Sequence, residues 1–70
     1  MTHTIRIEIE PQHAERLIAL AKAQMPALLH LRTSTPNVHQ FSSPDLHDIY
    51  KLGLLNGAFF QQKILNTSTQ

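Results

Sequence analysis

The sequence of 70 residues contains no cysteine, no tryptophan and only two glycines. Without cysteine the chain cannot form a disulfide, and this composition fits a reducing compartment, so we expect a cytoplasmic protein. Six Lys and Arg are balanced by five Asp and Glu, which gives a formal net charge of +1 at pH 7. The chain therefore lacks the excess charge of one sign that attracts nucleic acids, anionic lipids or acidic substrates.

Long hydrophobic runs are also missing. The longest apolar stretch, residues 52–60, is far shorter than the roughly 20 residues that span a bilayer. The first four residues show no basic segment followed by an apolar one, as a secretory signal would have. We therefore expect neither secretion nor a membrane partner.

What the chain does contain is the composition of an ordinary globular protein, with 41% hydrophobic residues. No repeat or linker divides the sequence, so residues 1–70 are expected to form a single small domain. A domain of this size buries only about 60% of the surface that its unfolded chain exposes. Because disulfides are excluded, a metal or a partner subunit would be needed to add stability.

Hydrophobic periodicity predicts the first two elements. Residues 4–10 alternate between isoleucines and polar residues, which predicts a half-buried strand. Apolar residues then recur at helical spacing over residues 11–24, and Pro11 is a suitable first helical residue. Pro26 is expected to end or kink this helix.

The middle of the chain, residues 26–43, has two interpretations. In the first, residues 29–33 and 38–41 form a short hairpin around the turn sequence Ser34-Thr35-Pro36-Asn37. In the second, the whole segment is an unusually long loop, and such loops tend to be functional or mobile. We favour the hairpin.

A long C-terminal helix is predicted from Pro44 to Leu65. Ser43 is a suitable N-cap and Pro44 a suitable first helical residue, and the sequence stays compatible with a helix as far as Leu65. The polar tail, residues 66–70, is expected to fray. The predicted fold is thus a small α+β domain with an N-terminal strand, a helix, a short hairpin and a long C-terminal helix.

This C-terminal helix is apolar on opposing flanks, and one short helix with a few small strands can hardly cover both. We therefore expect an intertwined or helix-packed homo-oligomer. Gly53 and Gly57 each cost about 1 kcal/mol relative to alanine in a helix interior, so a second backbone that passes close to them would explain their presence. The alternative is that one of them interrupts the helix. We assign the oligomer interface to the stripe that contains them, Leu46, Ile49, Gly53, Gly57, Phe60 and Ile64.

Five histidines, at positions 3, 13, 30, 39 and 47, are the only residues unusual enough in number to suggest metal or acid–base chemistry. No two of them lie three or four residues apart on a predicted helix. The cluster Asp45-Leu46-His47-Asp48 is explained equally well by exposed polar residues at a helix start. Ser42 and Ser43 lack an identifiable base and fit a capping role. We expect no catalytic, cofactor or metal site, and no enzyme.

The segment from Thr4 to Gln24, an alternating strand that runs through Glu10-Pro11 into a helix, resembles the first half of the ribbon-helix-helix family of dimeric DNA-binding repressors and antitoxins. Residues 42–49 loosely resemble the start of that family's second helix. In the family, strands from two protomers pair as an antiparallel ribbon in the major groove. The resemblance therefore implies that Thr4, Arg6 and Glu8 face a partner or DNA bases.

Two functions remain open from the sequence. The first is a small non-enzymatic, homo-oligomeric regulator or inhibitor that acts by binding another protein, which requires only surplus apolar surface and near-neutral charge. The alternative is a dimeric DNA-binding regulator or antitoxin of the ribbon-helix-helix type. Glutamates on the proposed reading face and the small net charge favour the first function.

Overall fold

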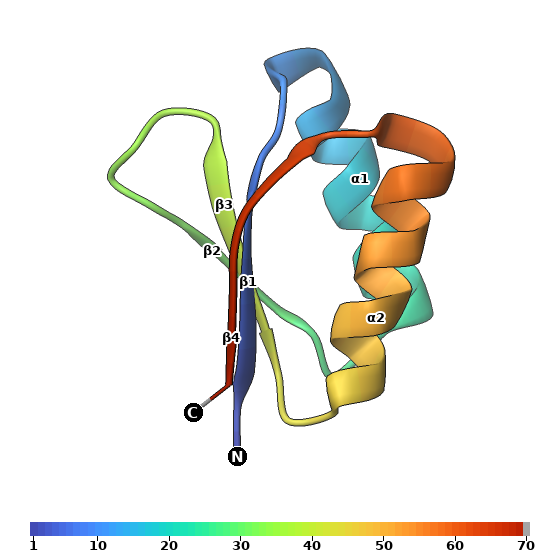
Figure 1. Ribbon diagram of the computed structural model, residues 1–70. Coiled ribbons are helices and arrows are strands. Elements are labelled where there is room, and N and C mark those ends of the chain that lie inside the picture. The colour runs from blue at the N-terminus through green and yellow to red at the C-terminus, as the bar shows by residue number, and fades with distance from the viewer. Residues whose placement is uncertain (70) are drawn as a thin grey trace.

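The first strand, β1 (His3–Glu8), lies inside a four-stranded antiparallel sheet of order β2-β3-β1-β4 (Figure 1). The other strands are β2 (Leu29–Arg32), β3 (Val38–Ser43) and β4 (Lys63–Thr69). This computed structural model describes residues 1–69 of the chain. The element order βαββαβ with this strand order is the split β-α-β arrangement called ferredoxin-like.

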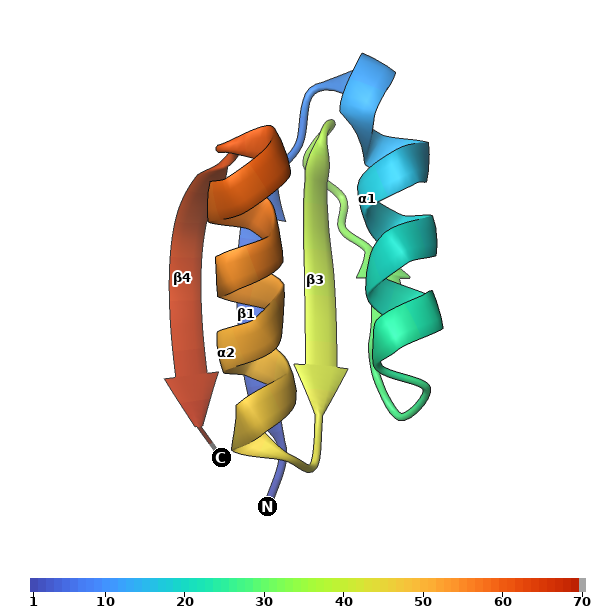
Figure 2. The same ribbon diagram turned by 90° about the vertical axis from the view of Figure 1, so that its right-hand side faces the viewer.

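Both helices pack on the same face of the sheet. Helix α1 (Pro11–Gln24) connects β1 to β2, and α2 (Leu46–Leu55) continues into a π-helical turn, η1 (Asn56–Phe60), before β4. Figure 2 shows the two helices side by side in front of the sheet. Within residues 1–69 this leaves the opposite face of the sheet, here called the open sheet face, without a helix.

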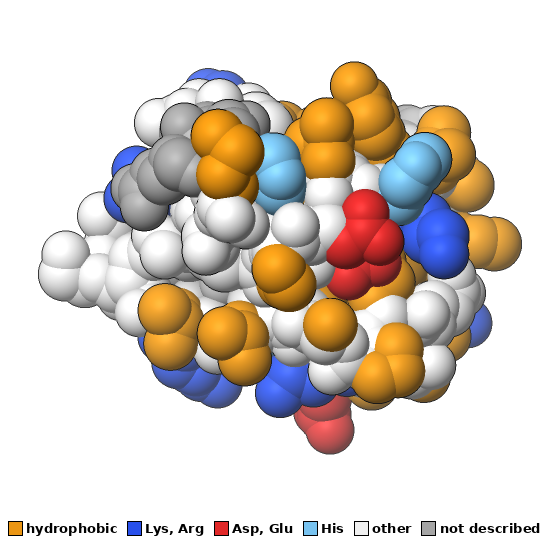
Figure 3. Space-filling view, turned by 90° about the horizontal axis from the view of Figure 1, so that it is seen from below, with side chains coloured by type: hydrophobic (Ala, Val, Ile, Leu, Met, Phe, Trp, Pro, Cys, Tyr) orange, Lys and Arg blue, Asp and Glu red, His pale blue; other side chains and the backbone are white. Residues whose placement is uncertain are grey.

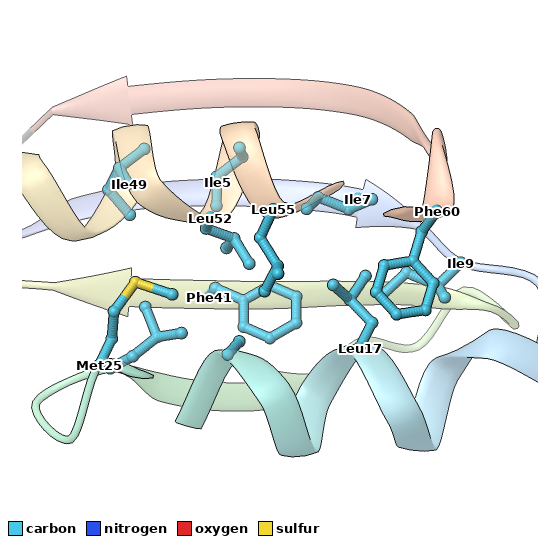
Figure 4. Close-up of a cluster of buried hydrophobic side chains, with 12 residues drawn as sticks. Ile5, Ile7, Ile9, Leu17, Met25, Phe41, Ile49, Leu52, Leu55 and Phe60 are labelled. Atoms are coloured by element: carbon cyan, nitrogen blue, oxygen red, sulfur yellow. The ribbon is translucent and has the colours of Figure 1, made fainter. Parts of the chain in front are cut away.

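The core lies between the sheet and the two helices (Figure 4). Ile5 and Ile7 of β1 point to this side, as the alternation of the strand predicts, and Phe41 of β3 lies directly across from Ile5. The helices contribute their apolar stripes. The buried hydrophobic cluster consists of Ile5, Ile7, Ile9, Leu17, Ala21, Met25, Leu28, Phe41, Ile49, Leu52, Leu55 and Phe60.

The first half of the chain follows the sequence prediction closely. Helix α1 spans the predicted residues 11–24, and β1 begins one residue earlier and ends two residues earlier than expected. Strands β2 and β3 pair as the predicted hairpin. Asn37 takes the left-handed conformation that its turn needs, with φ of 66°, which asparagine tolerates better than most residues.

The predicted C-terminal helix, however, is wrong. Helical structure covers only the 15 residues of α2 and η1, and β4 then returns antiparallel to β1. The chain reverses at Gln61, whose φ of 53° lies in the left-handed region that a helix cannot continue through. Neither glycine interrupts the helix, because Gly53 and Gly57 both precede this reversal and neither has a positive φ.

Both ends of this predicted helix also need correction. Ser43 is the last residue of β3, and the N-cap is Asp45, whose carboxylate accepts a hydrogen bond from the His47 N–H at 2.9 Å. Residues 66–69, predicted to fray, form the end of β4 and pair with β1, and Gln70 lies outside the described residues. Within residues 1–69 all four strands pair with one another in one sheet.

Candidate functional site

The residues assigned to the oligomer interface do not form one surface. Ile49 and Phe60 are buried in the chain's own core, and Ile64 lies on β4, where it is half exposed. Burial in the core removes Ile49 and Phe60 from an exposed interface, and the reversal at Gln61 places Ile64 on β4 and not on the helix. Leu46, Gly53 and Gly57 remain on the helical segment and outside the core cluster.

A set of exposed apolar side chains nevertheless lies on the outside of α2. Tyr50 and Leu54 are 64% and 73% exposed, and Leu46 is 40% exposed. These three residues are four apart, so they follow one another along a single face of the helix. We call Leu46, Tyr50, Gly53, Leu54 and Gly57 the α2 outer face. Figure 3 views the molecule from the end where α2 begins and shows hydrophobic side chains at several places around the acidic side chains there.

The two glycines of the α2 outer face border open space. A Cβ atom built on Gly53 or Gly57 would meet no atom within 4 Å, apart from the adjacent residues and the backbone of its own helix. Packing within the described chain therefore does not require glycine at either position. Because they are four residues apart, they form a strip of the helix surface without side chains, the glycine strip, where a second backbone has room to approach.

Thr4, Arg6 and Glu8 all lie on the open sheet face. The Thr4 Oγ1 is 3.2 Å from the Ser42 Oγ, and the Arg6 Nε donates a hydrogen bond of 3.1 Å to the Gln40 Oε1. Next to them on β2, the leucines at positions 29 and 31 are exposed on the same face. β1 is paired on both sides, with β3 and with β4, so its backbone is not free to form a ribbon with a second copy of β1.

A groove of about 720 Å³ lies on the other face of the sheet, between α1 and the β2–β3 hairpin. The helices leave this edge of the sheet partly uncovered, and β2 places His30 and Arg32 on the helix-facing side, because they lie across from Phe41 and His39. The wall formed by α1 is mainly apolar, with Ala14, Ile18 and Ala19. The hairpin wall is mainly polar and carries His30, Arg32, Thr33, Thr35, Asn37 and His39.

The two histidines in this groove are hydrogen-bonded to each other. The His30 Nε2 lies 2.8 Å from the His39 Nδ1, and the two rings are stacked with centroids 5.1 Å apart. Burial lowers the pKa of His30 below its usual 6.5, and the positive charges of His39, Lys22 and Arg32 lower it further. Burial, followed by the charge of Arg32, lowers the pKa of His39 in the same direction. Both rings are therefore mainly neutral at pH 7.

Sequence reasoning missed this pair, although a signal for it existed. His30 and His39 are nine residues apart, so no helical spacing connects them. Once the hairpin register places His30 across from Phe41, His39 lies two residues along the same strand and on the same face. Predicting the pair therefore requires the register of the hairpin, which depends on the turn.

The acidic cluster at the start of α2 has a structural role. Asp48 is buried, contrary to the exposed position predicted for it, and its Oδ2 accepts a 2.7 Å hydrogen bond from the Ser43 Oγ. The same Ser43 oxygen accepts a hydrogen bond from the Asp45 N–H at 3.1 Å. Within residues 1–69, no group of three or more His, Cys, Asp or Glu side chains is arranged to hold a metal ion.

No family model, curated protein or solved structure gives a significant match to this chain. The resemblance to the ribbon-helix-helix family therefore stays a prediction from the sequence pattern. Among the described residues, no helix has the length and hydrophobicity to cross a membrane.

Proposed function

We propose that this protein is a small non-enzymatic regulator or inhibitor that assembles with copies of itself and acts by binding another protein. The α2 outer face supports this proposal most directly. Leu46, Tyr50 and Leu54 expose apolar side chains in one line, and no other part of residues 1–69 covers them. Removing such surface from water is the main driving force for protein association.

A second copy of the chain fits the shape of this face. In a two-fold symmetric helix pair, residue i of one protomer contacts residue j of the other, and j contacts i. The large side chains Tyr50 and Leu54 of one protomer would then lie over the glycine strip of the other, and the reverse contact would form as well. Gly53 and Gly57 border open space within the chain, which is the condition that this packing needs.

The open sheet face is the second surface that we assign, and its proposed occupant is another protein. It combines exposed leucines at positions 29 and 31 with the polar pair Arg6 and Gln40. Mixed apolar and polar character is typical of interfaces between proteins that also exist separately. DNA is less favoured, because Glu8 lies on this face and both edges of β1 are already paired.

Light scattering tests the assembly by comparing two variants, each of which replaces one exposed leucine. Leu54→Gln removes apolar surface from the α2 outer face, whereas Leu31→Gln removes it from the open sheet face. We expect wild type and Leu31→Gln to be oligomers at micromolar concentration, and Leu54→Gln to shift toward the monomer. A folded wild-type protein with a mass of 7.9 kDa would contradict self-association.

Partner binding is tested separately, with the tagged protein in an extract of its native cells. We expect one protein to co-purify in a fixed ratio, and to be lost with Leu31→Gln. If wild type instead binds one DNA duplex tightly, and Arg6→Ala abolishes that binding at moderate salt, the DNA-binding alternative replaces this proposal.

A further inference from the structure

The groove between α1 and the β2–β3 hairpin joins an apolar wall to a wall of hydrogen-bond donors. Ala14 and Ile18 lie on the apolar side, and Arg32, His30 and His39 lie on the hairpin side. We propose that this groove binds a small organic anion, whose charged group lies at Arg32 and the histidine pair and whose apolar part lies on α1. This ligand site is separate from the surfaces assigned to protein binding.

The size of the groove fits a small molecule. Its volume of about 720 Å³ lies within the range of roughly 300–1,000 Å³ that is usual for ligand pockets. Such pockets combine mainly apolar walls with a few polar groups that fix the orientation of the ligand. Here the polar groups are concentrated on the hairpin, so a ligand with one polar end is the best match.

The charge around the histidine pair favours an anion over a metal cation. Besides burial and His39, the positive charges of Lys22 on α1 and Arg32 on β2 act on the His30 ring, and Arg32 also lines the groove. Glu15 is the one acidic residue on the groove wall, and it is exposed. Within the described chain no ion pair joins Glu15 to Arg32. The Arg32 guanidinium is therefore available to bind a carboxylate or phosphate through two parallel hydrogen bonds.

The hydrogen bond between the two rings determines what they can offer to a ligand. In the neutral pair one ring donates its N–H in the hydrogen bond between the His30 Nε2 and the His39 Nδ1. Whichever ring donates, the two remaining nitrogens are one donor and one acceptor. When the pair gains one proton, both of these nitrogens become donors. A bound anion stabilises that protonated form, so ligand binding takes up a proton and becomes tighter as the pH falls below neutral.

The experiment is a titration followed by NMR of the His30 and His39 ring protons. The probes are hexanoate and hexyl phosphate, with hexanol as the uncharged control and inorganic phosphate as the control without an apolar part. We expect one or both organic anions to bind with a Kd of about 1 mM and to shift both rings. The stronger of the two identifies the head group. Hexanol and inorganic phosphate should bind several-fold more weakly.

Two variants show whether the site is the one proposed. Arg32→Gln should weaken anion binding about tenfold, whereas Lys51→Gln, which removes a positive charge from α2, should leave it unchanged. The backbone NMR spectrum confirms that each variant is folded. Binding to wild type should also tighten between about pH 7.5 and about pH 6, where a carboxylate stays ionised. Absence of ring shifts, equal binding of hexanol, or an unchanged affinity in Arg32→Gln would each overturn the proposal.

Discussion

The side-chain amide of Asn56 forms two hydrogen bonds with the backbone of Gln62. Its Nδ2 donates to the Gln62 carbonyl at 2.8 Å, and its Oδ1 accepts from the Gln62 N–H at 2.9 Å. Asn56 is only 3% exposed, so the amide bridges the reversal from inside the molecule. Together with the left-handed Gln61, this contact ends the helical segment and sets the start of β4.

Replacing Asn56 with alanine should lower the free energy of unfolding by about 1–3 kcal/mol, because two backbone groups lose their partner in a partly buried place. Asn66→Ala is the matched control, since Asn66 is exposed on β4. Urea denaturation followed by circular dichroism measures both variants. Equal stability of the two would show that the Asn56 amide does not hold the reversal.

The conformation of Gln61 predicts opposite effects for two substitutions. Gln61→Gly should raise the free energy of unfolding by up to about 1 kcal/mol, because glycine adopts a positive φ without steric cost. Gln61→Val should lower it by at least about 1 kcal/mol, since a β-branched side chain is strained there. Thermal denaturation ranks the three proteins. A glycine variant less stable than wild type would contradict the assigned backbone strain.

The histidine pair predicts that acid destabilises the fold. The pKa values of His30 and His39 are lower in the folded protein than the usual 6.5, so the unfolded chain binds more protons in this region. The contribution of the two neutral rings to the free energy of unfolding is therefore fully present above pH 6.5. It is lost as the pH falls from 6.5 toward the lower pKa values of the folded protein. Lys22 and Arg32 are the charged residues that act on the pair.

Urea denaturation between about pH 7.5 and about pH 5.5 measures this effect, with His30→Gln as the comparison. We expect the variant to lose less stability than wild type over the interval, because one of the two shifted groups is gone. His47→Gln is the control, since His47 is exposed on α2 and outside the pair. Identical slopes for wild type and His30→Gln would refute the link between the pair and acid sensitivity.

Two substitutions at Gly57 distinguish effects on the stability of the single chain from effects on assembly. Gly57→Ala should raise the stability of the chain by up to about 1 kcal/mol, because the added methyl group meets no neighbour. Gly57→Leu should weaken assembly more than Gly57→Ala does, since its bulk fills the strip that the second copy would occupy. Sedimentation velocity gives the mass distribution of each variant. If both variants keep the wild-type mass, the second helix does not pass over Gly57.

The sequence predicts the first half of this fold because its signals are local. The alternation of isoleucines in β1, Pro11 at the start of α1 and the turn at Asn37 each act within a few residues. The second half depends on contacts that periodicity does not reveal. Asn56 and Gln61 are ordinary residues for a helical pattern, so the reversal appears only when the side-chain amide of Asn56 meets the backbone of Gln62.

The candidate sites also divide into features that local sequence predicts and features that need the folded chain. The open sheet face could be predicted for Thr4, Arg6 and Glu8, because alternation alone assigns a strand residue to one face. The proposed interface included Ile49 and Phe60, which the core uses, because a helical wheel does not show which apolar side faces the sheet. The groove needs three segments, α1, β2 and β3, and only the folded chain brings them together.

The pairing of β1 with β4 also makes the protein suitable for circular permutation. His3 lies across from Thr69 in the register, so the start of β1 and the end of β4 lie side by side at one end of the sheet (Figure 1). A linker of a few residues would join them, and new ends could be opened in the exposed turn at residues 34–37 without cutting a strand or helix. Such a circularly permuted protein would begin at the groove, and its sheet would form without the covalent turn between β2 and β3.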